Sequence, residues 1–366
     1  MNGLKRISLR TSLLCLPMLP FLSVQAEDNV EQLVKQEETA PQTVEQAAQD
    51  PKTLACLIDK LNKAGGQELV SKLRKECEVE INGPKDNSTK GAISKRFISE
   101  SETKFDPYVI TPHKMNYILP VSISDSMNRK TYAAQAPDSG WAENIEDYEA
   151  KYQLSIKVPL NYGDLFREGD SLYFGITIQS WWQLYSEGIS KPFRETNYQP
   201  EVFYLTGLDW KPFDGNTGFM VGLEHQSNGR STSISRSWNR VYLDLLWEKG
   251  NFALSFKPWY RLPEDDKEVM EDGSLDPDGD DNPDINEYMG YFSLGAVYKY
   301  NNLEFSLGVR ENFATHKGGA EVGMTFPLWG KLRGYVQGFT GYGESLIDYN
   351  HKQNRIGVGI ALTNIL

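Results

Sequence analysis

The sequence contains few cysteines and histidines, no excess of positive charge and no long apolar run. Its 366 residues include 3 cysteines and 4 histidines, and 38 basic against 50 acidic side chains give a net charge of −12. The acidic balance argues against nucleic acid as a partner, because phosphate backbones attract basic surfaces. After the N-terminal region, no segment reaches the ~18 consecutive apolar residues of a membrane-spanning helix, which argues against a helical membrane protein. The length also excludes a disulfide-stabilised miniprotein.

The first 26 residues predict a secretory signal peptide. Three basic residues precede a short apolar segment, residues 13–22, and small residues then allow cleavage after Ala26. Cleavage would leave only Cys56 and Cys77. Two cysteines in an exported protein favour a disulfide, with two free thiols as the alternative.

Aromatic residues and glycine are abundant, which fits β-strands with interfacial aromatic side chains better than helices. From about residue 113, apolar and polar residues alternate, most clearly where Ile356, Val358 and Ile360 are separated by glycines. The twelve strands predicted in this way lie near residues 115–123, 148–160, 171–184, 199–210, 216–227, 237–248, 251–260, 287–299, 303–313, 318–327, 331–343 and 354–366.

The lengths of the connections favour a membrane barrel. Even-numbered strands are followed by short turns, such as 249–250 and 300–302, whereas most odd-numbered strands are followed by longer polar segments. This asymmetry is typical of a transmembrane barrel with both termini in the periplasm, and closure leaves no unpaired strand edge. We therefore predict an all-β fold, a 12-stranded antiparallel transmembrane β-barrel. A secreted β-sandwich is the alternative, since it would show the same alternation with its apolar face turned inward.

Three regions follow from these patterns. Residues 1–26 form the signal peptide, residues 27–105 a periplasmic linker with a small helical extension, and residues 106–366 the barrel domain. Within the extension, apolar residues recur at helical spacing from Leu54 to Cys77, interrupted at Gly65.

Polar residues end the apolar series of two neighbouring strands. By parity, His225 and Ser227 on one strand and Asn239 on the next point toward lipid, near the end with long loops. Unpaired polar side chains on a lipid-facing wall cost roughly a few kcal/mol. Residues i and i+2 lie about 6.6 Å apart at Cα, and a register that pairs His225 with Asn239 would group a nucleophile, a base and an orienting amide. The alternative is a polar rim at the level of the lipid headgroups.

Two motifs extend this pattern into a family resemblance. Residues 225–231 (His-Gln-Ser-Asn-Gly-Arg-Ser) and 235–240 (Ser-Arg-Ser-Trp-Asn-Arg) resemble the signature of outer-membrane phospholipase A. Further similar segments are 180–184, 192–198, 257–260, 281–284, 288–291 and 341–350. The resemblance covers roughly residues 105–366.

The resemblance implies a calcium-dependent hydrolase of phospholipid acyl esters, of phospholipase A1, phospholipase A2 and lysophospholipase type. It implies a homodimer in the outer membrane of a Gram-negative bacterium, with the active site toward the outer leaflet. The family's nucleophile falls on Ser227, its base on His225 and its orienting amide on Asn239. Its oxyanion donor falls on the backbone N–H of Gly229.

The resemblance also implies calcium ligands. They fall on the carbonyl of Arg230, the hydroxyl of Ser235 and, from the neighbouring subunit, the carbonyl at Ser190, while Asp281 matches an acidic position of a second site. Oxygen donors of these kinds suit calcium. Thr232 stands where the family often has an aspartate, so we expect weaker calcium binding by the monomer.

Two further features concern the dimer interface and an acidic segment. Ile178 occupies a position where the family's dimer interface has a polar glutamine, so we expect more apolar dimer contacts. Residues 264–284 hold eleven acidic residues and one lysine, which predicts a solvated extracellular loop, with a divalent-ion site as the alternative reading.

The rival function is a non-enzymatic porin or structural barrel. A porin needs an open lumen, whereas twelve strands with inward charged and aromatic side chains are expected to fill theirs. A channel also has no use for a polar triad on its outer wall.

Overall fold

The computed structural model describes residues 51–63, 73, 76–77, 80–81, 91–104, 109–135, 140–161, 163–230, 234–268, 270, 279–330 and 332–363. The predicted signal peptide and most of the predicted linker lie outside this part of the chain. The chain divides into two compact units, residues 1–85 and 86–366.

The first unit contains helix α3 (Pro51–Lys63). A disulfide joins Cys56 on α3 to Cys77, which confirms the predicted pairing. Lys60 of α3 also forms an ion pair of 2.9 Å with Glu76. The two contacts tie α3 to the segment around Cys77.

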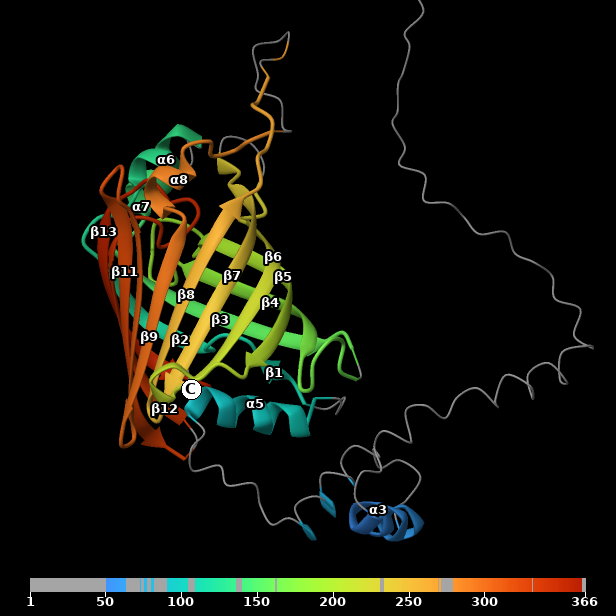
Figure 1. Cartoon of the computed structure of the whole chain (residues 1–366). Helices are drawn as coiled ribbons and strands as arrows, with labels where there is room; N and C mark the ends of the chain where they lie inside the picture. Colours follow the sequence, from blue (N-terminus) through green and yellow to red (C-terminus); the bar gives the residue numbers. More distant parts are fainter. Residues whose placement is uncertain are drawn as a thin grey trace, which may run out of the picture. The chain divides into compact units, whose positions relative to one another are not determined.

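The second unit is a closed antiparallel barrel (Figure 1). Its twelve long strands are β2 (Tyr117–Ser124), β3 (Tyr148–Pro159), β4 (Ser171–Trp182), β5 (Phe193–Leu208), β6 (Asn216–Ser227), β7 (Ser237–Lys249), β8 (Phe252–Arg261), β9 (Phe292–Tyr300), β10 (Leu303–Asn312), β11 (Lys317–Trp329), β12 (Leu332–Gly341) and β13 (Gln353–Ala361). Each pairs with the next, and β13 pairs with β2, where Val358 lies opposite Val121. A two-residue strand, β1 (Thr111–Pro112), adds to β3. The predicted barrel is confirmed, and the sandwich alternative is wrong.

Three predicted strand boundaries are wrong. The last strand, predicted over 354–366, ends at Ala361, where residues 362–363 form a bend. Strand β5 begins at Phe193 rather than near 199, since its ladder with β4 continues to the pair Trp182–Phe193. Strand β9 begins at Phe292 rather than 287, because Ile285–Met289 form helix α8. Ile285 and Met289 lie four residues apart and are both buried, so they share the inner face of α8.

The barrel wall is apolar outside and polar inside. Outward side chains that are at least 40 % exposed include Leu154, Val202, Leu223, Leu254, Val322 and Ile356. Inside, charged side chains are buried and paired: Arg194 contacts Glu149 at 2.9 Å and Asp348 at 2.8 Å. Lys151 contacts Glu344 at 2.9 Å. A lumen occupied by paired charges matches the sequence expectation and argues against an open pore.

The two ends of the barrel differ. The long connections, with α6 (Arg129–Gln135), α7 (Trp141–Asn144) and α8, gather at one end (Figure 1). At the other end, short turns such as Asn301-Asn302 join the strands, and helix α5 (Ala92–Glu102) lies at this same end (Figure 1). None of the described helices is both long and apolar enough to cross a membrane.

Helix α5 is held by barrel side chains. Glu248 accepts hydrogen bonds from the first backbone N–H groups of α5, at Ile93 (2.7 Å) and Ser94 (3.1 Å), as an anion at a helix N-terminus does. Lys157 of β3 forms an ion pair of 2.7 Å with Glu100. The helix therefore belongs with the barrel, whereas the sequence assigned these residues to the extension that ends at residue 105.

Candidate active site

Strands β6 and β7 bring two of the three predicted catalytic side chains into contact. Their register places His225 opposite Asn239 and Ser227 opposite Ser237. His225 Nδ1 lies 2.8 Å from Asn239 Oδ1. Leu223, on the same face as His225, is 57 % exposed, whereas the intervening Glu224 is buried inside. The histidine and the asparagine therefore meet on the outer wall, as strand parity predicts.

This contact determines what the imidazole can do. An amide oxygen accepts only, so Nδ1 carries the proton and donates it to Asn239. The other nitrogen, Nε2, is then an acceptor that can take a proton from a hydroxyl. Ser227 follows two residues after His225 on the same face of β6. Strand geometry therefore makes its hydroxyl the candidate proton donor to His225 Nε2.

A fourth residue joins this chain of contacts. Asn239 Nδ2 donates a hydrogen bond of 3.1 Å to Glu264 Oε1. Burial raises the pKa of the Glu264 carboxyl, while the hydrogen bond from Asn239 opposes that shift. The sequence predicts no role for Glu264 beyond the acidic loop. Its position depends on the path of the connection after β8 rather than on strand alternation.

The loop after β6 is shaped by Asn228. Its side-chain oxygen accepts the N–H of Arg236 (3.0 Å) and of Arg230 (3.3 Å), and its Nδ2 donates to the Ile234 carbonyl (2.7 Å). Gly229 has φ +61°, a left-handed conformation that favours glycine. A backbone N–H presented two residues after a nucleophile is the type of donor an oxyanion needs.

Arg230 connects this loop to the barrel. The Arg230 guanidinium donates to the backbone carbonyls of Phe193 (3.1 Å) and Arg194 (2.8 Å) at the start of β5. Thr232 lies outside the described residues, so the structure adds nothing to the expectation drawn from it.

Two of the predicted calcium ligands meet. Ser235 Oγ donates to Asp281 Oδ2 at 2.6 Å, and the other Asp281 oxygen pairs with Lys267 at 2.7 Å. Hydroxyl, carboxylate and carbonyl oxygens are the donors that calcium takes, so Ser235, Asp281 and the Arg230 carbonyl fit this ion chemically. Ser190 is exposed in the connection between β4 and β5, accessible to a neighbouring molecule. Within the described ranges, no cluster of three or more His, Cys, Asp or Glu side chains forms a metal site.

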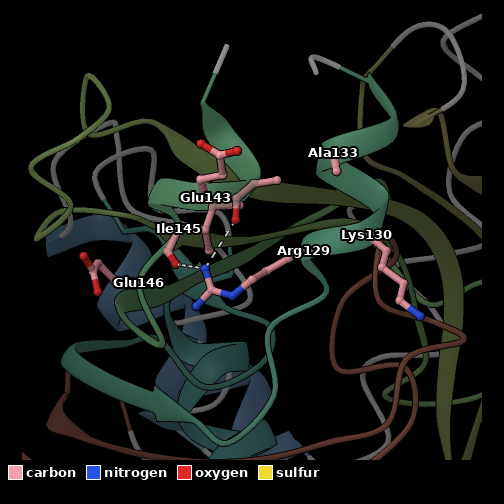
Figure 2. Close-up of a pocket in the computed structure, with 7 residues that line it drawn as sticks. Arg129, Lys130, Ala133, Glu143, Ile145 and Glu146 are labelled. Carbon is pink, nitrogen blue, oxygen red and sulfur yellow. Dashed lines mark hydrogen bonds between the residues drawn. The ribbon is translucent and has the colours of Figure 1, made fainter. Parts of the chain in front are cut away.

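A separate pocket lies between α6 and α7 (Figure 2). It has a volume of about 440 Å³ and is lined by Arg129, Lys130, Ala133, Ala142, Glu143, Ile145 and Glu146. Arg129 donates to the backbone carbonyls of Ala142 and Ile145 (Figure 2). None of the predicted site residues lines it, so the candidate chemistry belongs to the outer wall.

Known proteins are similar to this chain in sequence and in fold. The model of the family described as phospholipase A1 matches residues 93–362. Phospholipase A1 of Salmonella typhimurium is 39% identical over 280 residues, which are 76% of this chain and 89% of that protein. Phospholipase A1 of Escherichia coli K12 is 38% identical over 280 residues, with the same shares of the two chains.

Two solved structures are similar. Outer membrane phospholipase A from Escherichia coli superposes with a TM-score of 0.63 at 38% identity, covering 71% of this chain and all of that one. A dimer of the Salmonella typhi outer membrane phospholipase with bound calcium gives a TM-score of 0.64 at 37% identity, covering 74% of this chain and 98% of that one.

Proposed function

Because this chain belongs to the phospholipase A1 family, we propose that it hydrolyses phospholipid acyl esters with Ser227, His225 and Asn239 on the outer barrel wall. The protein is a phospholipase of the Gram-negative outer membrane, rather than the porin or structural barrel of the alternative. The observation that carries the proposed site is the hydrogen bond between His225 and Asn239 on an apolar, outward face.

The reaction runs in two halves on these groups. Ser227 Oγ attacks the ester carbonyl carbon while His225 Nε2 takes the hydroxyl proton. The imidazolium then gives that proton to the departing lysophospholipid oxygen, which leaves an acyl ester on Ser227. A water molecule, deprotonated by the same nitrogen, attacks the acyl ester, and the proton returns to Ser227 as the fatty acid leaves.

The outer wall suits a substrate that already lies in the membrane. Leu223 of β6 and Leu243 of β7 are diagonal neighbours, and both are exposed on the same face as His225. Their side chains would contact acyl chains, whereas the polar end of β6 reaches the headgroup level, where the ester lies. Ser227 ends β6 beside the long connections, so we place the site in the outer leaflet. The Gly229 N–H would receive the charge that develops on the carbonyl oxygen.

Calcium is the proposed cofactor. The Arg230 carbonyl and the Ser235 hydroxyl would hold it in one subunit, together with the carbonyl of Ser190 of the partner subunit. Asp281 would contribute a carboxylate to the second calcium site, that of the monomer. When bound, the ion supplies positive charge beside the ester carbonyl. The calcium-bound dimer of the Salmonella typhi protein supports this assignment.

A homodimer is the proposed active form, since a ligand set shared between subunits is complete only in a dimer. On this chain the outward side chain of Ile178 lies opposite Leu154 on one neighbouring strand and Tyr198 on the other. These three apolar or aromatic residues would give the two barrels a dimer surface in the membrane that needs no polar pairing.

Hydrolysis of phospholipid by the refolded protein in detergent micelles, with calcium or with a chelator, tests the proposal. Ser227→Ala and His225→Ala should abolish hydrolysis while leaving the folded barrel intact, because both side chains lie on the outer wall. Ser237→Ala, which removes a hydroxyl directly across the strands from Ser227, is the matched control and should stay active. Retained hydrolysis in Ser227→Ala would overturn the mechanism.

A further inference from the structure

The segment after β8 is docked against Asn239 at two points. The Leu262 N–H donates a hydrogen bond of 2.8 Å to the Asn239 backbone carbonyl. Two residues later, Glu264 accepts the bond of 3.1 Å from the Asn239 side chain. Backbone and side chain of the same asparagine are thus held by the same short segment.

Contacts on both sides fix this segment. Before it, Arg261 pairs with Asp280 at 2.6 Å, and after it, Lys267 pairs with Asp281 at 2.7 Å. Between these, the Asp280 N–H donates to the Asp265 carbonyl at 2.8 Å. Glu264 is therefore presented to Asn239 by a segment that is anchored at three points.

We propose that Glu264 is a positioning residue that extends the triad to Ser227–His225–Asn239–Glu264. This inference rests on the proposed roles of the first three residues. Glu264 touches neither the ester nor the imidazole, and it acts through the amide of Asn239.

The first contribution of Glu264 is to orient that amide. An asparagine side chain can turn over, which exchanges its oxygen for its NH₂ group. A turned amide would direct N–H toward His225 Nδ1 and favour the tautomer in which Nε2 carries the proton, and that tautomer cannot accept the proton of Ser227. An ionised carboxylate only accepts hydrogen bonds. Glu264 therefore pairs with the NH₂ end and keeps the oxygen on His225.

The second contribution is charge. The imidazole becomes positive when it takes the proton of Ser227, and a neutral amide provides no counter-charge. A carboxylate behind the amide supplies one and strengthens both hydrogen bonds of the chain by polarising them. Glutamine removes the charge but keeps an acceptor oxygen for the Asn239 NH₂ group. Its own NH₂ group can also donate, so glutamine holds the orientation of Asn239 less strictly than the carboxylate does.

Steady-state kinetics of three variants provide the test. Glu264→Ala removes both contributions and should lower kcat on the order of tenfold, about the cost of one hydrogen bond to a charged group, with KM nearly unchanged. Glu264→Gln should lose less. Glu268→Ala is the matched control, because it removes the same charge from an exposed position four residues further on, and it should match the unchanged protein.

A residue swap adds a measurement that a merely structural role would not affect. Asn239→Asp places two carboxylates face to face and should be severely impaired. Adding Glu264→Gln to Asn239→Asp restores a donor opposite the new carboxylate and should recover activity by about tenfold. The rate at which an alkylsulfonyl fluoride labels Ser227, read by mass spectrometry, should follow the same order as kcat.

The outcomes separate this inference from the proposed function. If Glu264→Ala has the kcat of Glu268→Ala, or if the swap recovers nothing, Glu264 does not position Asn239, although Ser227→Ala and His225→Ala stay inactive. If Ser227→Ala still hydrolyses phospholipid, the proposed triad itself fails. A loss confined to KM, with unchanged labelling of Ser227, also overturns the inference.

Discussion

A buried carboxylate at the end with long connections should make the free energy of unfolding of the barrel depend on pH. Glu344 lies between β12 and β13, and its carboxylate accepts from Lys151 (2.9 Å), Arg355 (2.7 Å) and Gln353 (2.8 Å). Burial alone would raise its pKa, but the charges of Arg355 and Lys151 outweigh burial and lower the pKa from 4.5 to about 2. A difference of one unit between the folded and unfolded pKa is worth about 1.4 kcal/mol. The lowered pKa of Glu344 therefore means that its ionised form stabilises the folded barrel by about 3 kcal/mol.

The sign follows from the direction of the shift. Because the pKa of Glu344 is lower in the folded protein, the stabilisation is complete above pH 4.5, the unfolded value, and is lost as the pH falls toward 2. Glu344→Gln should therefore reduce the free energy of unfolding by about 3 kcal/mol at pH 7 and by little at pH 2. Urea unfolding in detergent micelles, followed by tryptophan fluorescence, measures both values, with Glu287→Gln at an exposed position as control. An equal difference at the two pH values would refute the reasoning.

Three further predictions concern the reaction centre. Asn239→Ala should lower kcat by about 10- to 100-fold, the cost of one hydrogen bond to a group that becomes charged. Steady-state kinetics should therefore show a smaller loss than in Ser227→Ala. A larger loss than in Ser227→Ala would assign Asn239 another role. Ser235→Ala should raise the calcium concentration for half-maximal activity, whereas Ser190→Ala, which keeps its carbonyl, should not; equal effects in a calcium titration would contradict the ligand assignment. Gly229→Ala should strain a backbone at φ +61° by about 1–2 kcal/mol and slow acylation. The measurement is the rate at which Ser227 reacts with a sulfonyl fluoride. An unchanged rate would remove the Gly229 N–H from the mechanism.

Strand alternation predicted the barrel and the core of the site. Because side chains on a strand alternate with period two, the apolar series through Leu223 fixes the outward direction of His225 without knowledge of the rest of the fold. The loop between β6 and β7 then fixes the register, and the pair His225–Asn239 follows. These inferences need only neighbouring residues, which is why the sequence contains them.

The features that the sequence missed depend on distant contacts. Helix α8 is too short to show a clear period, and its buried face is defined by the barrel end that it covers. Helix α5 is held by Glu248, more than 150 residues away. The contact of Glu264 with Asn239 likewise depends on how the connection after β8 folds back. None of these partners is marked by periodicity.

The pairing of β13 with β2 has a consequence for how the protein is made. Arg355 lies opposite Ser124, so two segments separated by more than 200 residues must find each other, at a loop-closure cost of about 5 kcal/mol if the intervening chain were flexible. Until residues 353–361 arrive, β2 and β12 each present a row of unpaired backbone groups, which hydrocarbon cannot satisfy. The chain therefore has to be kept in a transport-competent state until its last strand has been exported, and a nascent chain stalled before β13 would be a natural substrate for degradation rather than a smaller barrel.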